Sequence, residues 1–151
     1  MQSYSPSRIL LAVDFSDVTD SLVDTVAGVA RDPAGAVWVV HVAAPDPQFI
    51  GYEIGPQSVR DIRARELKDE HARLDEIKRA LEAKNLHARA FLLQGETVGT
   101  LLEQAERMRA DLVILGSHGH GMLFKSLVGS VSEGVLRGAT CPVLLVPSPR
   151  T

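Results

Sequence analysis

The segment Val37-Trp38-Val39-Val40-His41-Val42 indicates the fold class of this chain. It is apolar at nearly every position, whereas a strand with one solvated face would alternate between apolar and polar residues. A continuous apolar run of this length is typical of a parallel strand that is covered on both faces. The sequence therefore predicts a buried strand over residues 36–42, in a sheet with helices on both sides.

The segments around this strand alternate between short apolar runs and amphipathic stretches. Upstream, 9–13 predicts a strand, followed by a helix that begins after the N-cap candidates Ser16 and Asp17 and stops at Asp32-Pro33. Downstream, the sequence predicts a helix over 57–84 and then, in order, strand 88–93, helix 97–109, strand 111–115, helix 126–137 and strand 142–146. The 57–84 helix carries a repeating apolar face: Val59, Ile62, Leu67, Leu74, Ile77 and Leu81. We expect a single-domain α/β fold with an open, five-stranded parallel sheet and helices on both faces.

Composition limits the classes of function. A chain of 151 residues fits one domain, because domains hold roughly 100 to 200 residues. Its 16 Lys and Arg residues against 19 Asp and Glu residues give a net charge of −3, so no general positive field is available for nucleic acid. No apolar stretch approaches the ~18 residues of a membrane span, and residues 1–8 lack the apolar core of a secretion signal. The single cysteine, Cys141, cannot form an internal disulfide. We expect a cytoplasmic protein that neither inserts into membranes nor binds nucleic acid.

The exit of the predicted fourth strand carries the most informative polar segment, Gly116-Ser117-His118-Gly119-His120-Gly121. Its glycines allow backbone N–H groups to turn towards an anion. Gly129 and Ser130 follow near the start of the fourth predicted helix, where unpaired N–H groups favour negative charge. Because ligands of open parallel sheets bind beyond the carboxyl ends of the strands, the loop predicts a phosphate site. As a bare pattern, it is equally compatible with a tight turn that holds no ligand.

Two common phosphate motifs do not match the chain. A Walker loop requires Lys and then Ser or Thr directly after its second glycine, and Met122-Leu123 stand there instead. A dinucleotide fingerprint would follow the first strand, where the segment 14–17 contains no glycine. A serine-hydrolase elbow also does not fit the register of the loop.

The spacing Gly116-x-x-Gly119, nine residues, then Gly129-Ser130 resembles the nucleotide-binding pattern of universal stress proteins. The resemblance spans essentially the whole chain, from Asp14-Phe15-Ser16 to the segment 141–147. It implies a Rossmann-like sheet in the order 3-2-1-4-5 and membership of the ATP-binding branch. We expect the nucleotide-binding domain to cover 8–147, between a flexible tail at 1–7 and a second tail at 148–151.

The resemblance also implies a set of site residues. Asp14 and Val42 are expected to contact adenine and ribose, although an Asp at a strand end also commonly caps the next helix. Ribose and phosphates are expected to contact Gly116, Gly119, Gly129, Ser130, Val131 and Ser132. Further candidate phosphate contacts are Ser117, His118, His120 and Lys125. The expected ligand is ATP with Mg²⁺ carried by the nucleotide, and no metal site formed by the protein alone is expected. His41 is expected to be a packed strand residue, and Cys141 is expected to be a buried apolar residue.

Some positions depart from the family pattern. Ala12 replaces a common proline, and Gly134 and Gly138 stand where larger residues are usual. Because glycine in a helix costs about 1 kcal/mol relative to alanine, the fourth helix is expected to be looser than in relatives.

Three functions are compatible with this pattern. The leading hypothesis is a nucleotide-dependent stress-response or regulatory protein that is at most a slow ATPase. We expect it to form a homodimer through the exposed edge strand at 143–146 and to act on an unidentified regulatory protein. The segment 44–56 is expected to close over the site as a lid. The alternative is a hydrolase or nucleotidyl-transferring enzyme that uses His118, His120 and Asp14. The third is an interaction module whose pocket holds nothing.

Overall fold

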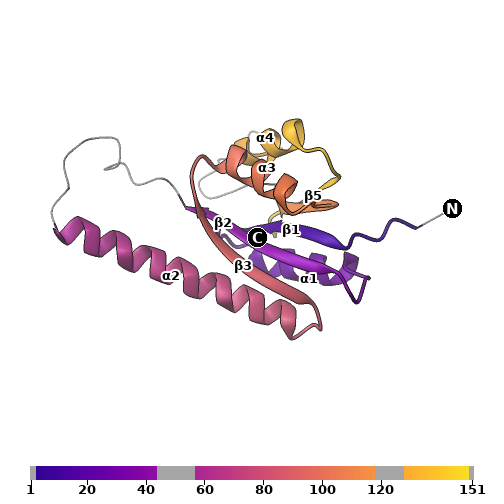
Figure 1. Cartoon of the computed structure of the whole chain (residues 1–151), viewed down its shortest axis with the longest axis horizontal. Helices are drawn as coiled ribbons and strands as arrows, with labels where there is room; N and C mark the ends of the chain where they lie inside the picture. Colours follow the sequence, from indigo (N-terminus) through magenta and orange to yellow (C-terminus); the bar gives the residue numbers. More distant parts are fainter. Residues whose placement is uncertain (1–2, 44–56, 118–127, 150–151) are drawn as a thin grey trace.

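A parallel sheet flanked by helices forms the frame of the computed structural model. Within the described residues, 3–43, 57–117 and 128–149, five strands are all parallel and lie in the order β3-β2-β1-β4-β5 (Figure 1). The strands are β1 (Arg8–Ala12), β2 (Ala36–Ala43), β3 (His87–Gln94), β4 (Leu112–Gly116) and β5 (Val143–Val146). The helices are α1 (Thr19–Val29), α2 (Gln57–Glu82), α3 (Thr97–Arg107) and α4 (Ser130–Gly138). The predicted fold class and strand order are confirmed.

Each face of the sheet is covered by its own pair of helices. Figure 1 shows α1 and α2 on one side and α3 and α4 on the other. Alternate residues of β2 serve the two cores: Val37 and Val39 pack with the α1 and α2 cluster, whereas Val40 and Val42 pack with the α3 and α4 cluster. Because both faces bury apolar side chains, β2 needs no polar alternation. This is the physical reason for its apolar sequence.

The start of α1 differs from the prediction. Ser16 and Asp17 are not its N-cap; that position belongs to Val18, whose side chain cannot accept a hydrogen bond. The Ser16 carbonyl instead accepts hydrogen bonds from the N–H of Thr19 at 3.2 Å and from its hydroxyl at 2.7 Å. A tight turn precedes the helix, with Phe15 at a φ of 60°. The prediction of the cap was wrong because the side chains before α1 hold that turn rather than the helix.

The start of α4 also differs. The predicted helix over 126–137 begins outside the described residues, but the described Val128 and Gly129 are not helical and α4 begins at Ser130. Gly129 is its N-cap, with an extended backbone at a φ of −71° and a ψ of 164°. The first turn of α4 therefore follows directly after Gly129, which has no side chain.

The two glycines inside α4 allow close packing on α3. A Cβ atom added at Gly134 would lie 2.8 Å from Cγ2 of Val98 and 2.9 Å from Cγ1, and one added at Gly138 would meet Leu102. Val98 is β-branched and therefore stiff. The two glycines therefore have a packing role at the contact between α3 and α4. This role depends on Val98 and Leu102, which lie more than thirty residues away in sequence.

We expect Gly134→Ala to lower the free energy of unfolding by about 1 kcal/mol. Overpacking costs about 1 to 3 kcal/mol, and the better helix propensity of alanine returns about 1 kcal/mol. The matched control is Gly28→Ala in α1, where the added Cβ has no described atom within 4 Å apart from its chain neighbours and the backbone of its own helix. That control should raise the free energy of unfolding by about 0.5 to 1 kcal/mol. Urea denaturation measures both values, and stabilisation by both changes would contradict the argument.

The Asp111 carboxylate joins the starts of β1 and β4. Its Oδ2 accepts from the N–H and the hydroxyl of Ser7 at 3.0 and 3.1 Å, and its Oδ1 accepts from the N–H of Arg8 at 2.9 Å. The hydroxyl of Tyr4 donates to the Asp111 carbonyl. These bonds hold Tyr4 and Ser7, which belong to the segment 1–7 predicted as a flexible tail, at the amino end of the sheet. None of the helices within the described ranges is long and apolar enough to span a membrane.

Candidate functional site

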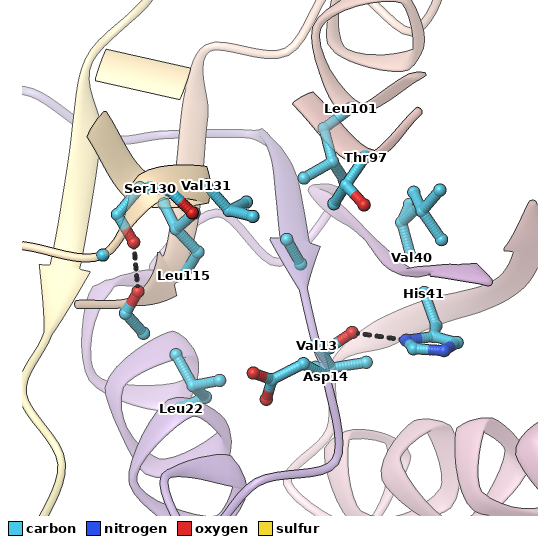
Figure 2. Close-up of a pocket in the computed structure, with 15 residues that line it drawn as sticks. Val13, Asp14, Leu22, Val40, His41, Thr97, Leu101, Leu115, Ser130 and Val131 are labelled. Atoms are coloured by element: carbon cyan, nitrogen blue, oxygen red, sulfur yellow. Dashed lines mark hydrogen bonds between the residues drawn. The ribbon is translucent and has the colours of Figure 1, made fainter. Parts of the chain in front are cut away.

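A cavity of about 350 Å³ opens at the carboxyl ends of β1 and β4 (Figure 2). The sheet continues from β1 to β2 and β3 in one direction and from β4 to β5 in the other. The strand order therefore reverses direction between β1 and β4, and ligands of open α/β sheets bind in the crevice at such a point. The predicted location of the site is the location of the cavity.

Asp14 supplies the carboxylate of this cavity. It follows β1, and the N–H of the preceding Val13 donates to the Val40 carbonyl at 2.9 Å. Asp14 Oδ1 accepts from the N–H of Ser16 at 3.0 Å, so the side chain stabilises the turn before α1 rather than capping the helix. Figure 2 shows the carboxylate turned away from the His41 ring. Its position suits acceptance of hydrogen bonds from a ligand.

The opposite side of the cavity is built from the end of β4 and the start of α4. The N–H of Ser117 donates to the Val146 carbonyl at 2.9 Å, and the Ser117 carbonyl accepts from the N–H of Gly129 at 2.6 Å. The hydroxyl of Ser132 donates to the Gly116 carbonyl at 2.6 Å. Because that hydrogen bond uses its proton, the Ser132 hydroxyl is not an open donor in the cavity wall.

The first turn of α4 forms part of the cavity wall through Gly129, Ser130, Val131 and Ser132. N–H groups in a first turn have no partner within their own helix, and the helix dipole makes this end positive. The N-cap is Gly129, so this residue adds no side chain at the end of the helix where an anion would bind. The cavity therefore combines a carboxylate on one side with hydrogen-bond donors on the other.

Apolar side chains form most of the remaining wall. They come from helices on both faces of the sheet and from the strands between them: Leu22, Val40, Val42, Leu101 and Leu115. A mostly apolar wall with a few polar groups at defined places is typical of a small-molecule site. This wall suits a flat, weakly polar ring system.

The structure brings together most of the predicted site residues. Those that line the cavity are Asp14, Val42, Gly116, Gly129, Ser130, Val131 and Ser132. Ser117 lies directly beside it, bonded to Gly129. The predictions for His118, Gly119, His120 and Lys125, and for a lid over 44–56, fall outside the described residues.

Two polar lining residues, His41 and Thr97, were not among the predicted site residues. Nδ1 of His41 donates to the Val13 carbonyl at 2.8 Å, and the ring lies 4.4 Å from that of Phe15. The sequence contained one signal for His41, its place directly before Val42 at a strand exit. Thr97 gave none, because its approach to the cavity depends on how α3 crosses the sheet.

Cys141 lies at the other end of the sheet, just before β5, and is half-buried rather than fully buried. Burial raises the pKa of its thiol, and the negative charge of Asp111 raises it further. The thiolate fraction at a given pH is therefore smaller than that of a free cysteine. Since folding favours the protonated thiol, this group makes the native state relatively less stable as the pH rises from the unfolded pKa to the folded one.

We expect iodoacetamide to alkylate Cys141 more slowly in the native protein than in the unfolded chain, because the thiolate is the reacting species. The pH at which the rate reaches half its maximum should also lie higher in the native state. Rates measured across the alkaline range, with and without guanidinium chloride, check this result. A native midpoint at or below the unfolded one would contradict it, because restricted access alone slows the reaction without moving the midpoint.

Sequence comparison finds relatives that match nearly the whole chain. Residues 6–147 match the sequence profile of the Universal stress protein family. Universal stress protein MJ0531 of Methanocaldococcus jannaschii is 28% identical over 144 residues, which cover 95% of this chain and 83% of that protein. Universal stress protein A homolog 1 of Coxiella burnetii is 33% identical over 140 residues, which cover 92% and 94%.

Solved structures share the fold. Hypothetical protein MJ0577 superposes with a TM-score of 0.82 at 24% identity, covering 98% of this chain and 100% of that one. A universal stress protein in complex with cAMP gives 0.64 at 19% identity, covering 97% and 100%. A universal stress protein family protein from Arabidopsis thaliana with AMP bound gives 0.64 at 18% identity, covering 95% and 93%. Given the profile match from residue 6 to residue 147, this chain belongs to the universal stress protein family.

Proposed function

We propose that this protein binds an adenine nucleotide, ATP with Mg²⁺, in the cavity between β1 and β4, and acts as a nucleotide-dependent stress-response or regulatory protein. The main observation in its support is that Asp14 and the first turn of α4, whose N-cap is a glycine, line the same cavity. A nucleotide carries hydroxyl donors at its ribose and acceptor oxygens at its phosphates. The Asp14 carboxylate on one side of the cavity suits the ribose hydroxyl donors, and the N–H groups of α4 on the other side suit the phosphate acceptors.

Each part of a nucleotide has a counterpart in the cavity. The Asp14 carboxylate accepts hydrogen bonds from ribose, and the first-turn N–H groups of α4 donate to phosphate oxygens. The apolar wall around Leu101 and Leu115 accommodates adenine. The AMP and cAMP bound to two proteins of the same fold support this assignment of ligand class.

Mg²⁺ fits this site as a companion of the nucleotide. Across residues 3–43, 57–117 and 128–149, no group of three or more His, Cys, Asp and Glu side chains could hold a metal. Mg²⁺ typically keeps several of its waters and is held largely by substrate phosphates, so the nucleotide phosphates at α4 would carry the ion while Asp14 stays with the ribose. When bound, the ion would neutralise part of the triphosphate charge.

Rapid hydrolysis of ATP is not expected from the described wall. Asp14 and His41 are the only ionisable side chains among the described lining residues, and no Lys or Arg among them could clamp a transferring phosphate. We expect turnover far below the roughly 1 s⁻¹ of typical kinases. The alternative enzyme relies on His118 and His120, which lie outside the described residues, so no observation favours it.

We also propose a homodimer through β5. Among the described strands, β5 pairs with β4 alone and lies at the edge of the sheet, and its residues Val143, Leu144 and Leu145 are half-buried. A strand edge with apolar side chains favours pairing with a second copy. Pro142 and Pro147 limit the length of that pairing because proline lacks an N–H donor.

Calorimetry on protein that has been unfolded, freed of small molecules and refolded tests the binding proposal. We expect ATP to bind more tightly than adenosine, because adenosine lacks the phosphates that the first turn of α4 would recognise. Phosphate release measured in parallel should stay far below about 1 s⁻¹. Flat titrations with ATP, AMP and adenosine would refute the proposal, and sedimentation equilibrium of the same material tests the dimer.

A further inference from the structure

His41 contacts the chain on both sides of Asp14. Its Nδ1 is 2.8 Å from the carbonyl oxygen of Val13, the residue before Asp14. Its ring lies 4.4 Å from the ring of Phe15, the residue after Asp14, at an angle of 42°. The His41 side chain is only 13% exposed. One half-buried ring therefore contacts both neighbours of Asp14, the residue whose carboxylate lines the cavity.

The chemistry of these contacts determines the state of the ring. A carbonyl oxygen only accepts hydrogen bonds, so Nδ1 of His41 carries the proton and donates it. The other ring nitrogen, Nε2, lies 3.8 Å from Oε1 of Glu70 on α2. His41 is thus packed between the exit of β1 and the helix that covers it, and its orientation is set from two elements.

The turn after β1 needs such support. Phe15 has a φ of 60°, a left-handed conformation that residues with a side chain rarely adopt. The Arg73 guanidinium lies 5.4 Å from the Phe15 ring centroid, and the His41 ring packs against the same aromatic side chain. Asp14 directs its carboxylate into the cavity from this turn, with Oδ1 bonded to the N–H of Ser16 at 3.0 Å. Release of the turn would release the carboxylate.

We propose that His41 is a positioning residue that fixes the Asp14 carboxylate for ligand binding. This inference rests on the proposed function, because it gives His41 a role in recognising the ribose of the nucleotide. His41 acts through Asp14 and the Val13–Ser16 turn, and its own contact with the ligand is not required. The Nδ1–H donor is the essential feature, since it joins β2 to the carbonyl next to Asp14.

Two substitutions separate the donor from the ring. In His41→Asn the side-chain amide reaches the position of Nδ1 and still donates to Val13, whereas His41→Phe keeps a ring beside Phe15 and lacks the donor. We expect His41→Phe to weaken AMP binding about tenfold and His41→Asn to weaken it less than about threefold, because a lost hydrogen bond is worth roughly a factor of ten. The matched control is His87→Phe, an exposed position at the start of β3, which should leave AMP binding unchanged.

A double-mutant cycle shows whether His41 acts through Asp14. In an Asp14→Ala background, His41→Phe should change AMP affinity by less than about twofold. An undiminished tenfold loss in that background would overturn the proposal, as would full AMP affinity in the His41→Phe single variant.

A ligand-free measurement keeps this inference distinct from the proposed function. In NMR spectra of the free protein, the Ser16 amide proton should show the downfield shift of a hydrogen bond to a carboxylate in the wild type and in His41→Asn, and lose it in His41→Phe. If no adenine compound binds, the proposed function fails, and this signal still decides whether His41 positions Asp14. An unchanged Ser16 signal in His41→Phe would overturn the positioning role.

Discussion

Replacing Ser130 with proline should weaken ATP binding by about 10- to 100-fold while leaving the fold intact. Ser130 is the first residue of α4, a position where proline is favoured because its φ suits the helix and its missing N–H has no helical partner. The preceding Gly129 already has the extended backbone, at a ψ of 164°, that a residue before proline requires. The substitution therefore removes one N–H donor from the cavity wall, and a hydrogen bond to a charged group is worth about 1.5 to 3 kcal/mol.

Two controls isolate that donor. Ser130→Ala removes the hydroxyl and keeps the N–H, so ATP affinity should change by no more than about threefold. Adenosine has no phosphate, and its affinity should be the same in the wild type and in Ser130→Pro. Equal losses for ATP and adenosine would show that proline disturbs the cavity as a whole, which would contradict the assignment of α4 to the phosphate.

Replacing Leu74 with alanine should lower the free energy of unfolding by about 2 to 5 kcal/mol, the usual cost of truncating a fully buried leucine. Leu74 lies on α2 with an exposed fraction of 0% and packs into the core beneath the sheet. Denaturation in urea, followed by circular dichroism, measures the change.

Ile62→Ala on the same helix is the matched control and should change stability by less than about 0.5 kcal/mol. Ile62 is 55% exposed, and Figure 1 shows the amino-terminal part of α2 reaching past the end of the sheet. Similar losses at Leu74 and Ile62 would contradict this difference, because they would require both halves of α2 to be anchored equally.

The helix α2 illustrates how far the sequence alone could predict the fold. Its apolar face recurs at helical spacing through both Ile62 and Leu74, and the predicted range 57–84 agrees closely with Gln57–Glu82. The same pattern gave no indication that Ile62 would be exposed and Leu74 buried. Helical periodicity is a local property, whereas burial depends on where the sheet beneath the helix ends.

The candidate site, like the fold, was predictable from the sequence only in part. The glycine spacing and the polar residue after the first strand predicted candidate site residues, and Asp14, Gly116 and Ser130 among them line one cavity. His41 was interpreted as a packed strand residue, because nothing in its neighbourhood along the chain connects it with Val13 or Glu70. Those contacts join β2 to β1 and to α2.

The sequence by itself determined the order of strands and helices, the apolar strand β2 covered on both faces and the polar residues at the strand exits. Those features follow from hydrophobic periodicity and from the backbone preferences of glycine and proline, which act over a few neighbouring residues. Only the tertiary structure decided that Ser132 uses its hydroxyl on Gly116, that Gly134 makes room for Val98, and that His41 holds the turn carrying Asp14. Each of these depends on chain segments that meet only when the sheet assembles in the order β3-β2-β1-β4-β5.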